Sequence, residues 1–167
     1  MPKRISPRLL TALATALLVS SCSAAGQDRA ARDPYPYWEQ GAGAPEAAAF
    51  MKVQVPAGAV EVKGAVQANP REDVYLLSFV TGAETAVRIA EDLRSEKPIH
   101  TKAADLPPDR ELFGHVGLPE PQTLKGARWA GVCPPCVGDE RRRSVAWIDV
   151  YVYDMAGGRS RVYLHAF

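Results

Sequence analysis

The chain has 167 residues, of which 20 are lysine or arginine and 19 are aspartate or glutamate, and its formal net charge is +1. This balance excludes the strongly basic class of protein, so it gives no electrostatic reason to expect nucleic acid binding. The length is that of a single domain with a targeting segment, and it is large enough to bury a core.

The first 22 residues have the layout of an export signal. Three basic residues, Lys3, Arg4 and Arg8, precede an apolar run that begins at Leu9, and small residues lead from that run to Cys22. A basic start, a short apolar stretch and small residues before a cleavage point are typical of a secretory signal. The apolar run is too short to cross a bilayer as a helix, which takes about 20 residues.

The end of this signal is more specific. Val19, Ser20, Ser21 and Cys22 match the lipobox position by position, so the chain resembles a bacterial lipoprotein. The resemblance implies a signal peptide over residues 1–21, cleavage before Cys22 and covalent diacylglycerol on the Cys22 sulfur; we expect no other cofactor. It also implies export and a lipid anchor on the outer side of the cytoplasmic membrane, or in the outer membrane of a Gram-negative cell. The whole chain is similar to small actinobacterial-type lipoproteins of uncharacterised function.

Cleavage changes both the charge and the cysteine count. Residues 1–21 hold three basic residues and no acidic one, so their removal leaves 146 residues with a net charge of −2. Of the three cysteines, lipid on Cys22 leaves Cys133 and Cys136 as a pair in a compartment that permits disulfides.

Residues 22–44 are predicted to be a flexible, lipid-anchored tether, because small and polar residues flank a Pro-rich aromatic stretch and Gly41 to Ala44 alternate glycine with alanine. The aromatic side chains, Tyr35, Tyr37 and Trp38, have three interpretations that the sequence leaves open: contact with the membrane interface, packing on the domain, or no role.

A single α+β domain is predicted over residues 45–167. A short helix at residues 46–51 precedes strands at 59–67 and 74–80, which form a hairpin. The main amphipathic helix spans about residues 82–94, and Thr81 and Glu84 have the spacing of a capping box at its start. Residues 97–121 are rich in proline and irregular, and residues 123–132 are a further strand. The prediction is an antiparallel sheet of four to five strands with that helix packed on one face.

The clearest element is a C-terminal β-hairpin over about residues 144–167, which turns at Gly157 and Gly158. One of its faces is aliphatic and is expected to cover the main helix. The other face carries a candidate binding surface made of Trp147, Asp149, Tyr151, Tyr153 and Tyr163. Aromatic side chains around a few polar groups suit recognition of a protein or another cell-envelope ligand. The competing interpretation is that residues 97–121 cover this face and make a second small core.

The pair Cys133 and Cys136 has the spacing of redox centres, but no helix follows it and no βαβ pattern surrounds it. A local structural disulfide is therefore favoured over thiol–disulfide exchange. A zinc site lacks two ligands at a suitable spacing, so no metal is expected. The run Arg141 to Arg143 is either an anion site or a solvated loop, since acidic residues precede it.

No nucleophile elbow, phosphate loop or metalloprotease motif is present. These observations favour a non-enzymatic, membrane-anchored binding or interaction module. The alternative function is that of an extracytoplasmic thiol–disulfide redox protein that uses Cys133 and Cys136.

Overall fold

The computed structural model describes residues 35–101 and 111–167. The strands are β1 (Tyr37–Gly43), β2 (Val60–Ala68), β3 (Val74–Gly82), β4 (His100–Thr101), β5 (Arg128–Val132), β6 (Ile148–Met155) and β7 (Arg159–Ala166). The α-helices are α1 (Ala44–Met51) and α2 (Ala83–Asp92), and three short 3-10 segments are η1 (Phe113–Val116), η2 (Pro121–Thr123) and η3 (Glu140–Arg142).

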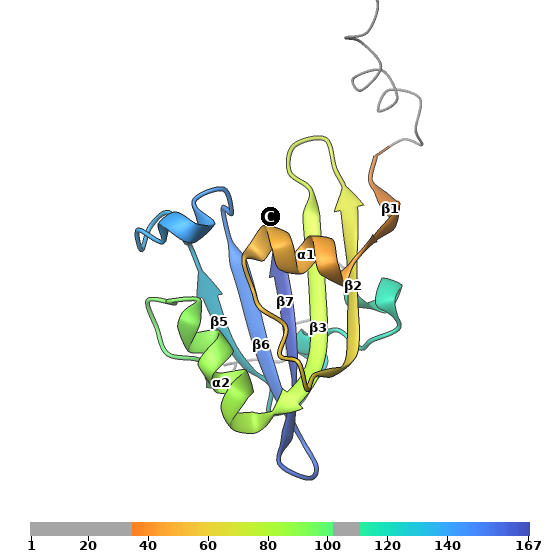
Figure 1. Ribbon diagram of the computed structural model, residues 1–167. Helices are drawn as coiled ribbons and strands as arrows, with labels where there is room; N and C mark the ends of the chain where they lie inside the picture. The colour runs from red at the N-terminus through yellow and green to blue at the C-terminus, as the bar shows by residue number, and fades with distance from the viewer. Residues whose placement is uncertain (1–34, 102–110) are drawn as a thin grey trace, which may run out of the picture. The chain divides into compact units, whose positions relative to one another are not determined.

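The strands form one antiparallel sheet in the order β1-β2-β3-β7-β6-β5-β4 (Figure 1). The α+β class is therefore confirmed. The predicted count of four to five strands is too low, because the sheet has seven strands within the described residues, one of them the two-residue β4. The predicted hairpins are present as β2–β3 and β6–β7, and the second turns through Gly157 and Gly158 with φ of 74° and 68°.

The strand β1 lies where the sequence predicts a flexible tether up to residue 44. Tyr37 pairs with Ala68 of β2, and after a bulge Gly43 pairs with Ala65. Gly41 has a φ of +82°, so this glycine lets the strand bend at the bulge. A Gly-Ala composition that is typical of a linker thus belongs to an edge strand, and the folded part includes residues 35–44. The rest of the predicted tether, residues 22–34, falls outside the described residues.

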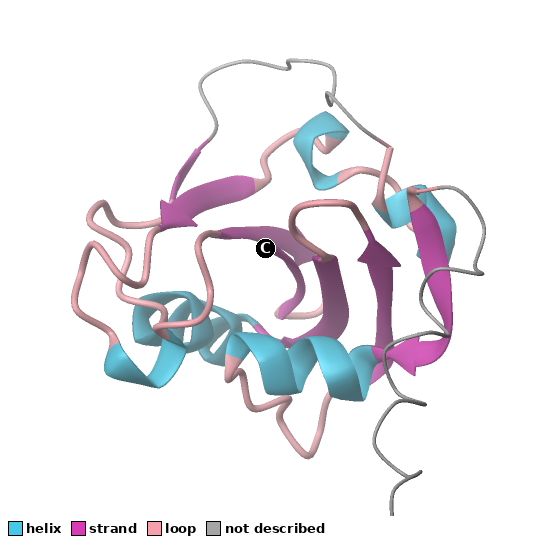
Figure 2. Ribbon diagram, turned by 90° about the horizontal axis from the view of Figure 1, so that it is seen from above, coloured by secondary structure: helices cyan, strands magenta, loops and turns pink. Residues whose placement is uncertain are grey.

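Both α-helices lie on the same face of the sheet (Figures 1 and 2). The aliphatic side chains of the β6–β7 hairpin make the core there, as predicted: Ile148, Val150, Val152, Val162, Leu164 and Ala166 are all buried. From α2, Ala86 and Ala90 pack into this cluster, and from α1, Ala47 and Met51 do.

The predicted capping box at α2 is wrong. Thr81 remains in β3, paired with Ser160 of β7, and Gly82 is the N-terminal cap residue without a side-chain bond. The first helical amide, that of Ala83, instead donates to the carbonyl of Gly158 at 3.1 Å. The turn of the C-terminal hairpin therefore supplies an acceptor for one of the amides that have no partner within the helix.

The opposite face of the sheet is covered by residues 111–124, which we call the covering segment; it contains η1 and η2 (Figure 2). Leu112 and Phe113 pack there with Leu76, Tyr151 and Tyr163 in a second buried cluster. The ring of Phe113 meets that of Tyr163 edge-on, with 5.1 Å between the ring centres. The interpretation that residues 97–121 make a second small core is confirmed for residues 111–121, whereas residues 102–110 lie outside the described residues.

Candidate functional site

The predicted binding surface of the C-terminal hairpin is divided by the covering segment. Tyr151 and Tyr163 are 7% and 1% exposed, so neither is available to a ligand while the covering segment is in place. Tyr153 and Trp147 are partly exposed. These two rings are buried because removing their apolar surface from water is favourable, and Leu112 and Phe113 supply the apolar side chains that cover them.

The covering segment is held by contacts at each of its turns. The Nζ of Lys63, on β2, donates to the carbonyl of Val116 at 3.0 Å. Trp38 of β1 stacks on His115, with 3.9 Å between the ring centres. Glu120 is buried and accepts the amide of Gly114 at 3.0 Å. Burial raises the pKa of the Glu120 carboxyl above its ordinary value, although hydrogen bonds from backbone amides, that of Gly114 first, oppose the rise.

Beside this covered region, three strands bring polar groups into one row. Asp149 of β6 lies between Gly131 of β5 and His165 of β7 as direct cross-strand partners. Trp129 and Trp147 flank the row, and both indole Nε1 groups donate to the same oxygen, Oδ1 of Asp149, at 3.0 Å each. We call Trp129, Trp147, Asp149 and His165 the Asp149 cluster.

The other carboxylate oxygen of Asp149 faces His165, with 3.4 Å between Oδ2 and Nδ1. Burial alone would raise the pKa of Asp149, but hydrogen bonds from His165, Trp147 and Trp129 outweigh it and lower that pKa. The carboxylate is therefore charged at neutral pH. The side chains of Asp149 and His165 are 21% and 22% exposed, so the cluster reaches the surface.

Gly131 makes room for the two indoles. A Cβ at this position would lie 2.3 Å from the Cζ2 of Trp147 and 3.1 Å from the Cζ2 of Trp129. Both rings thus pass over the backbone of β5, where no side chain larger than hydrogen fits. Of this cluster the sequence identified Trp147 and Asp149. It did not include Trp129 or His165 among the candidate residues, because only the pairing of β5 and β7 with β6 brings them to Asp149. For the same reason it did not identify the role of Gly131 beside the cluster.

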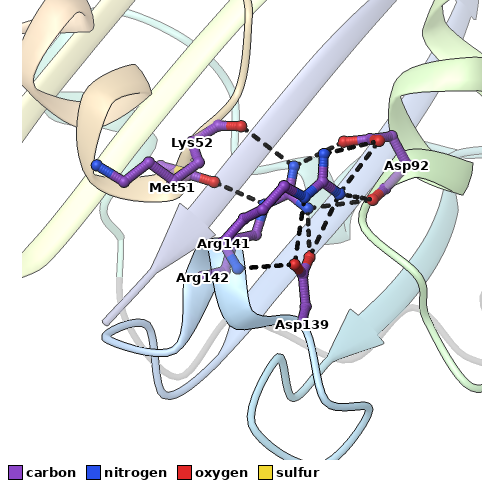
Figure 3. Close-up of polar contacts among 6 residues, drawn as sticks. All are labelled: Met51, Lys52, Asp92, Asp139, Arg141 and Arg142. Atoms are coloured by element: carbon purple, nitrogen blue, oxygen red, sulfur yellow. Dashed lines mark hydrogen bonds and ion pairs between the residues drawn. The ribbon is translucent and has the colours of Figure 1, made fainter.

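A second polar cluster is centred on Arg142, which is 1% exposed (Figure 3). Its Nε donates to the carbonyl of Met51 at 2.8 Å. Its Nη1 donates to the carbonyl of Asp92 at 3.1 Å and to Oδ2 of Asp139 at 2.6 Å. Its Nη2 donates to the carbonyl of Lys52 at 3.1 Å and to Oδ2 of Asp92 at 2.7 Å. All five N–H donors of the guanidinium therefore have acceptors.

These contacts tie the ends of both α-helices to the connection between β5 and β6, and we call them the Arg142 tie. Met51 and Asp92 are the last residues of α1 and α2, whose final carbonyls have no partner within the helix. A cation placed there also matches the negative end of each helix dipole. A hydrogen bond from Arg142 lowers the pKa of the Asp92 carboxyl below its ordinary range. Burial alone would raise the pKa of Asp139, but hydrogen bonds from Arg141 and Arg142 outweigh it and lower that pKa.

The hypothesis that Arg141 to Arg143 form an anion site is not supported by this arrangement. Arg142 has no free donor, and Arg141 pairs with Asp92 and Asp139 at 3.2 Å each. Arg143 is the one exposed arginine of the run for which the structure gives no acidic partner among the described residues.

A disulfide joins Cys133 and Cys136 directly after β5, in the position that the sequence analysis favours. The two cysteines lie in a turn rather than at the start of an α-helix, and Cys136 is exposed. Over the described ranges no group of three or more histidine, cysteine or acidic residues is arranged to hold a metal ion.

Cys22 and the predicted signal lie outside the described residues. In the part of the chain that the structure describes, no helix is both long and apolar enough to span a bilayer. Comparison of the chain with family models, curated proteins and solved structures gives no match.

Proposed function

We propose that this chain is an extracytoplasmic lipoprotein, anchored through diacylglycerol on Cys22, that binds another component of the cell envelope through the Asp149 cluster. Membrane attachment is inferred from the lipobox resemblance at Val19 to Cys22. The disulfide between Cys133 and Cys136 fits an exported protein, since such bonds persist outside the reducing cytosol. We propose no catalytic activity.

The observation that carries the binding proposal is the Asp149 cluster. Both indole N–H groups are used by Asp149, so Trp129 and Trp147 present apolar ring surface rather than free donors. His165 turns Nδ1 toward Asp149, which leaves its Nε2 for a further hydrogen bond. A partly exposed surface of aromatic rings with one oriented polar group is typical of an interface core.

The binding test is site-specific photo-crosslinking in intact membranes. A photoreactive phenylalanine analogue replaces Trp147, which directly precedes β6. The matched control carries the analogue at Met155, which is 38% exposed at the far end of β6. We expect a discrete crosslinked species from position 147 and none from position 155. Crosslinking that is equal at the two positions, or absent from position 147, would contradict the assignment of this surface.

The anchoring test is independent of the ligand. A palmitate analogue supplied to growing cells should label the wild-type chain, and Cys22→Ala should remove both the label and the membrane fractionation. The matched control is Cys133→Ser, which changes an extracytoplasmic cysteine and should keep the label. A C22A protein that still carries the label would refute lipidation at this residue.

The alternative function, thiol–disulfide exchange, is favoured by one observation: Cys136 is exposed and therefore accessible to another thiol. Against it, the pair follows a strand and lacks the helix N-terminus that activates a redox cysteine. A reduction potential below about −300 mV would mark the bond as structural, whereas a value near that of the compartment would favour redox work.

A further inference from the structure

The disulfide and the Arg142 tie belong to one short stretch of chain. The backbone bonds of the turn all return to residues that the disulfide closes. The amide of Cys136 donates to the carbonyl of Cys133 at 3.0 Å, and the amide of Val137 donates to the same oxygen at 3.2 Å. The amide of Asp139 donates to the carbonyl of Pro134 at 2.9 Å. The position of Asp139 is therefore set by the four-residue loop that Cys133 and Cys136 close.

Asp139 in turn positions Arg142. Its side chain is 2% exposed and accepts Nη1 of Arg142 at 2.6 Å, while its Oδ1 accepts the backbone amide of Arg141 at 3.2 Å. Because a buried guanidinium needs a buried counter-charge, Arg142 stays in place only while Asp139 does. Asp92 is 54% exposed and is a weaker counter-charge, since solvent screens it.

Arg142 in turn bonds the carbonyls of Met51, Lys52 and Asp92 at the ends of α1 and α2 (Figure 3). A continuous series of contacts therefore runs from the disulfide to both helix ends. The central strands β3 and β7 take no part in this series, because their hydrogen bonds run to each other and to β2 and β6.

We propose that the Cys133–Cys136 disulfide is a redox-sensitive latch: its reduction releases Asp139 and Arg142 and loosens the C-terminal ends of α1 and α2 while the sheet stays intact. This device does not depend on the ligand or the membrane anchor proposed above. The exposed end of the bond is at Cys136, and the reductant is a dithiol, either a small molecule or a redox protein.

The chemistry is an ordinary two-electron exchange. A thiolate of the dithiol attacks the Sγ of Cys136, the S–S bond breaks, and Cys133 leaves as a thiolate that takes up a proton. The second thiol of the reductant, after losing its proton, attacks its own sulfur in the mixed disulfide. It forms the cyclic disulfide of the oxidised reductant and releases Cys136, which is protonated. The protein gains two electrons and two protons, and the dithiol loses them.

The test is hydrogen exchange with mass analysis on the purified full-length protein, oxidised and after treatment with dithiothreitol. Reduction should speed exchange at the helix ends, for example at the amides of Val53 and Arg94, which bond within the last turns of α1 and α2, by about tenfold or more. Peptides from β3 and β7 should exchange at unchanged rates. A Cys133→Ser/Cys136→Ser variant should show the loosened pattern without reductant.

Two further variants separate the latch from a general loss of stability. In Asp139→Ala both side-chain acceptors are removed, so the series of contacts is already broken and reduction should have no additional effect on the helix ends. In the matched control Arg143→Gln, at an exposed site, the full effect of reduction should remain. If D139A does not fold, the double cysteine variant decides alone. The proposal is overturned if dithiothreitol leaves the bond intact, if the helix ends do not respond, or if β3 and β7 respond as strongly as the helices.

Discussion

Arg142 offers the sharpest test of how this domain is held together, through the substitution Arg142→Met. Methionine keeps much of the volume of the side chain but removes all five donors. The carbonyls of Met51, Lys52 and Asp92 then lose their side-chain donor. Asp139, which is 2% exposed, keeps its charge with only Arg141 as a partner.

The magnitude follows from which of these losses are buried. Removing one partner of a buried ion pair costs about 3–5 kcal/mol, because the remaining charge is not solvated. The exposed Asp92 carboxylate adds little to this, since water replaces its partner. A small domain has about 5–15 kcal/mol of stability in total. R142M should therefore lower the free energy of unfolding by about 3–5 kcal/mol and leave the domain marginally stable.

The assay is urea unfolding followed by tryptophan fluorescence, with an unchanged m-value as evidence that the folded state keeps its compactness. Arg143→Met, the exposed neighbour, should change the free energy of unfolding by no more than about 0.5 kcal/mol. Arg142→Lys keeps the charge without the planar fork, so its stability should lie between wild type and R142M. A loss below about 1 kcal/mol in R142M would contradict a buried structural role for Arg142, because that is the size of a single exposed contact.

Three more predictions concern the other face of the sheet. Glu120→Gln keeps an acceptor for the Gly114 amide. Because the pKa of Glu120 is raised on folding, the wild type loses stability as pH rises above about 4.5. The melting temperature of E120Q should therefore exceed that of wild type at pH 7, and the difference between the two should disappear in acid. Gly131→Ala should displace both indoles, cost about 1–3 kcal/mol and shift the tryptophan fluorescence, while Gly58→Ala, where a Cβ meets nothing within 4 Å, should do neither. Asp149→Ala should destabilise by about 1–3 kcal/mol because both indole donors lose their acceptor, whereas Asp149→Asn keeps an oxygen for them and should cost less; equal losses by urea unfolding would argue against this role.

Elements defined by local pattern were predicted well. From Ile148 onward the predicted alternation is confirmed, because the structure buries Ile148, Val150 and Leu164 against the helices. It is wrong for the residues before β6, where Val145 is buried in the main core and Ala146 is exposed. The apolar stripe of α2 was also found, since a spacing of three to four residues encodes which side faces the core. Such patterns can be recognised from the sequence because they depend only on a few neighbouring residues.

Features that depend on distant partners were not predicted. β1 is a strand because β2 offers it an edge, and nothing in the Gly-Ala composition of residues 41–44 indicates that edge. Thr81 does not cap α2 because it is still part of β3, where it pairs with Ser160 of β7, far along the chain. The sequence alone does not distinguish Arg142 from the two arginines beside it. Arg142 is buried because the ends of two helices, at residues 51 and 92, meet around its side chain.

The Arg142 tie and the Asp149 cluster each contain a charged side chain that is largely shielded from water, but the two charges have different kinds of hydrogen-bond partner. Arg142 is matched by three backbone carbonyls and two carboxylates and is 1% exposed, so no group remains for a ligand and its role is structural. Asp149 is matched only by side chains, two indoles and an imidazole, and the cluster is partly exposed. Side-chain partners of this kind are replaceable without loss of backbone hydrogen bonding, and their position at the surface supports the proposal that this cluster binds a partner. Since residues 133–147 carry both the disulfide turn and Trp147, the same connection between β5 and β6 links the stabilising charge to the candidate contact surface.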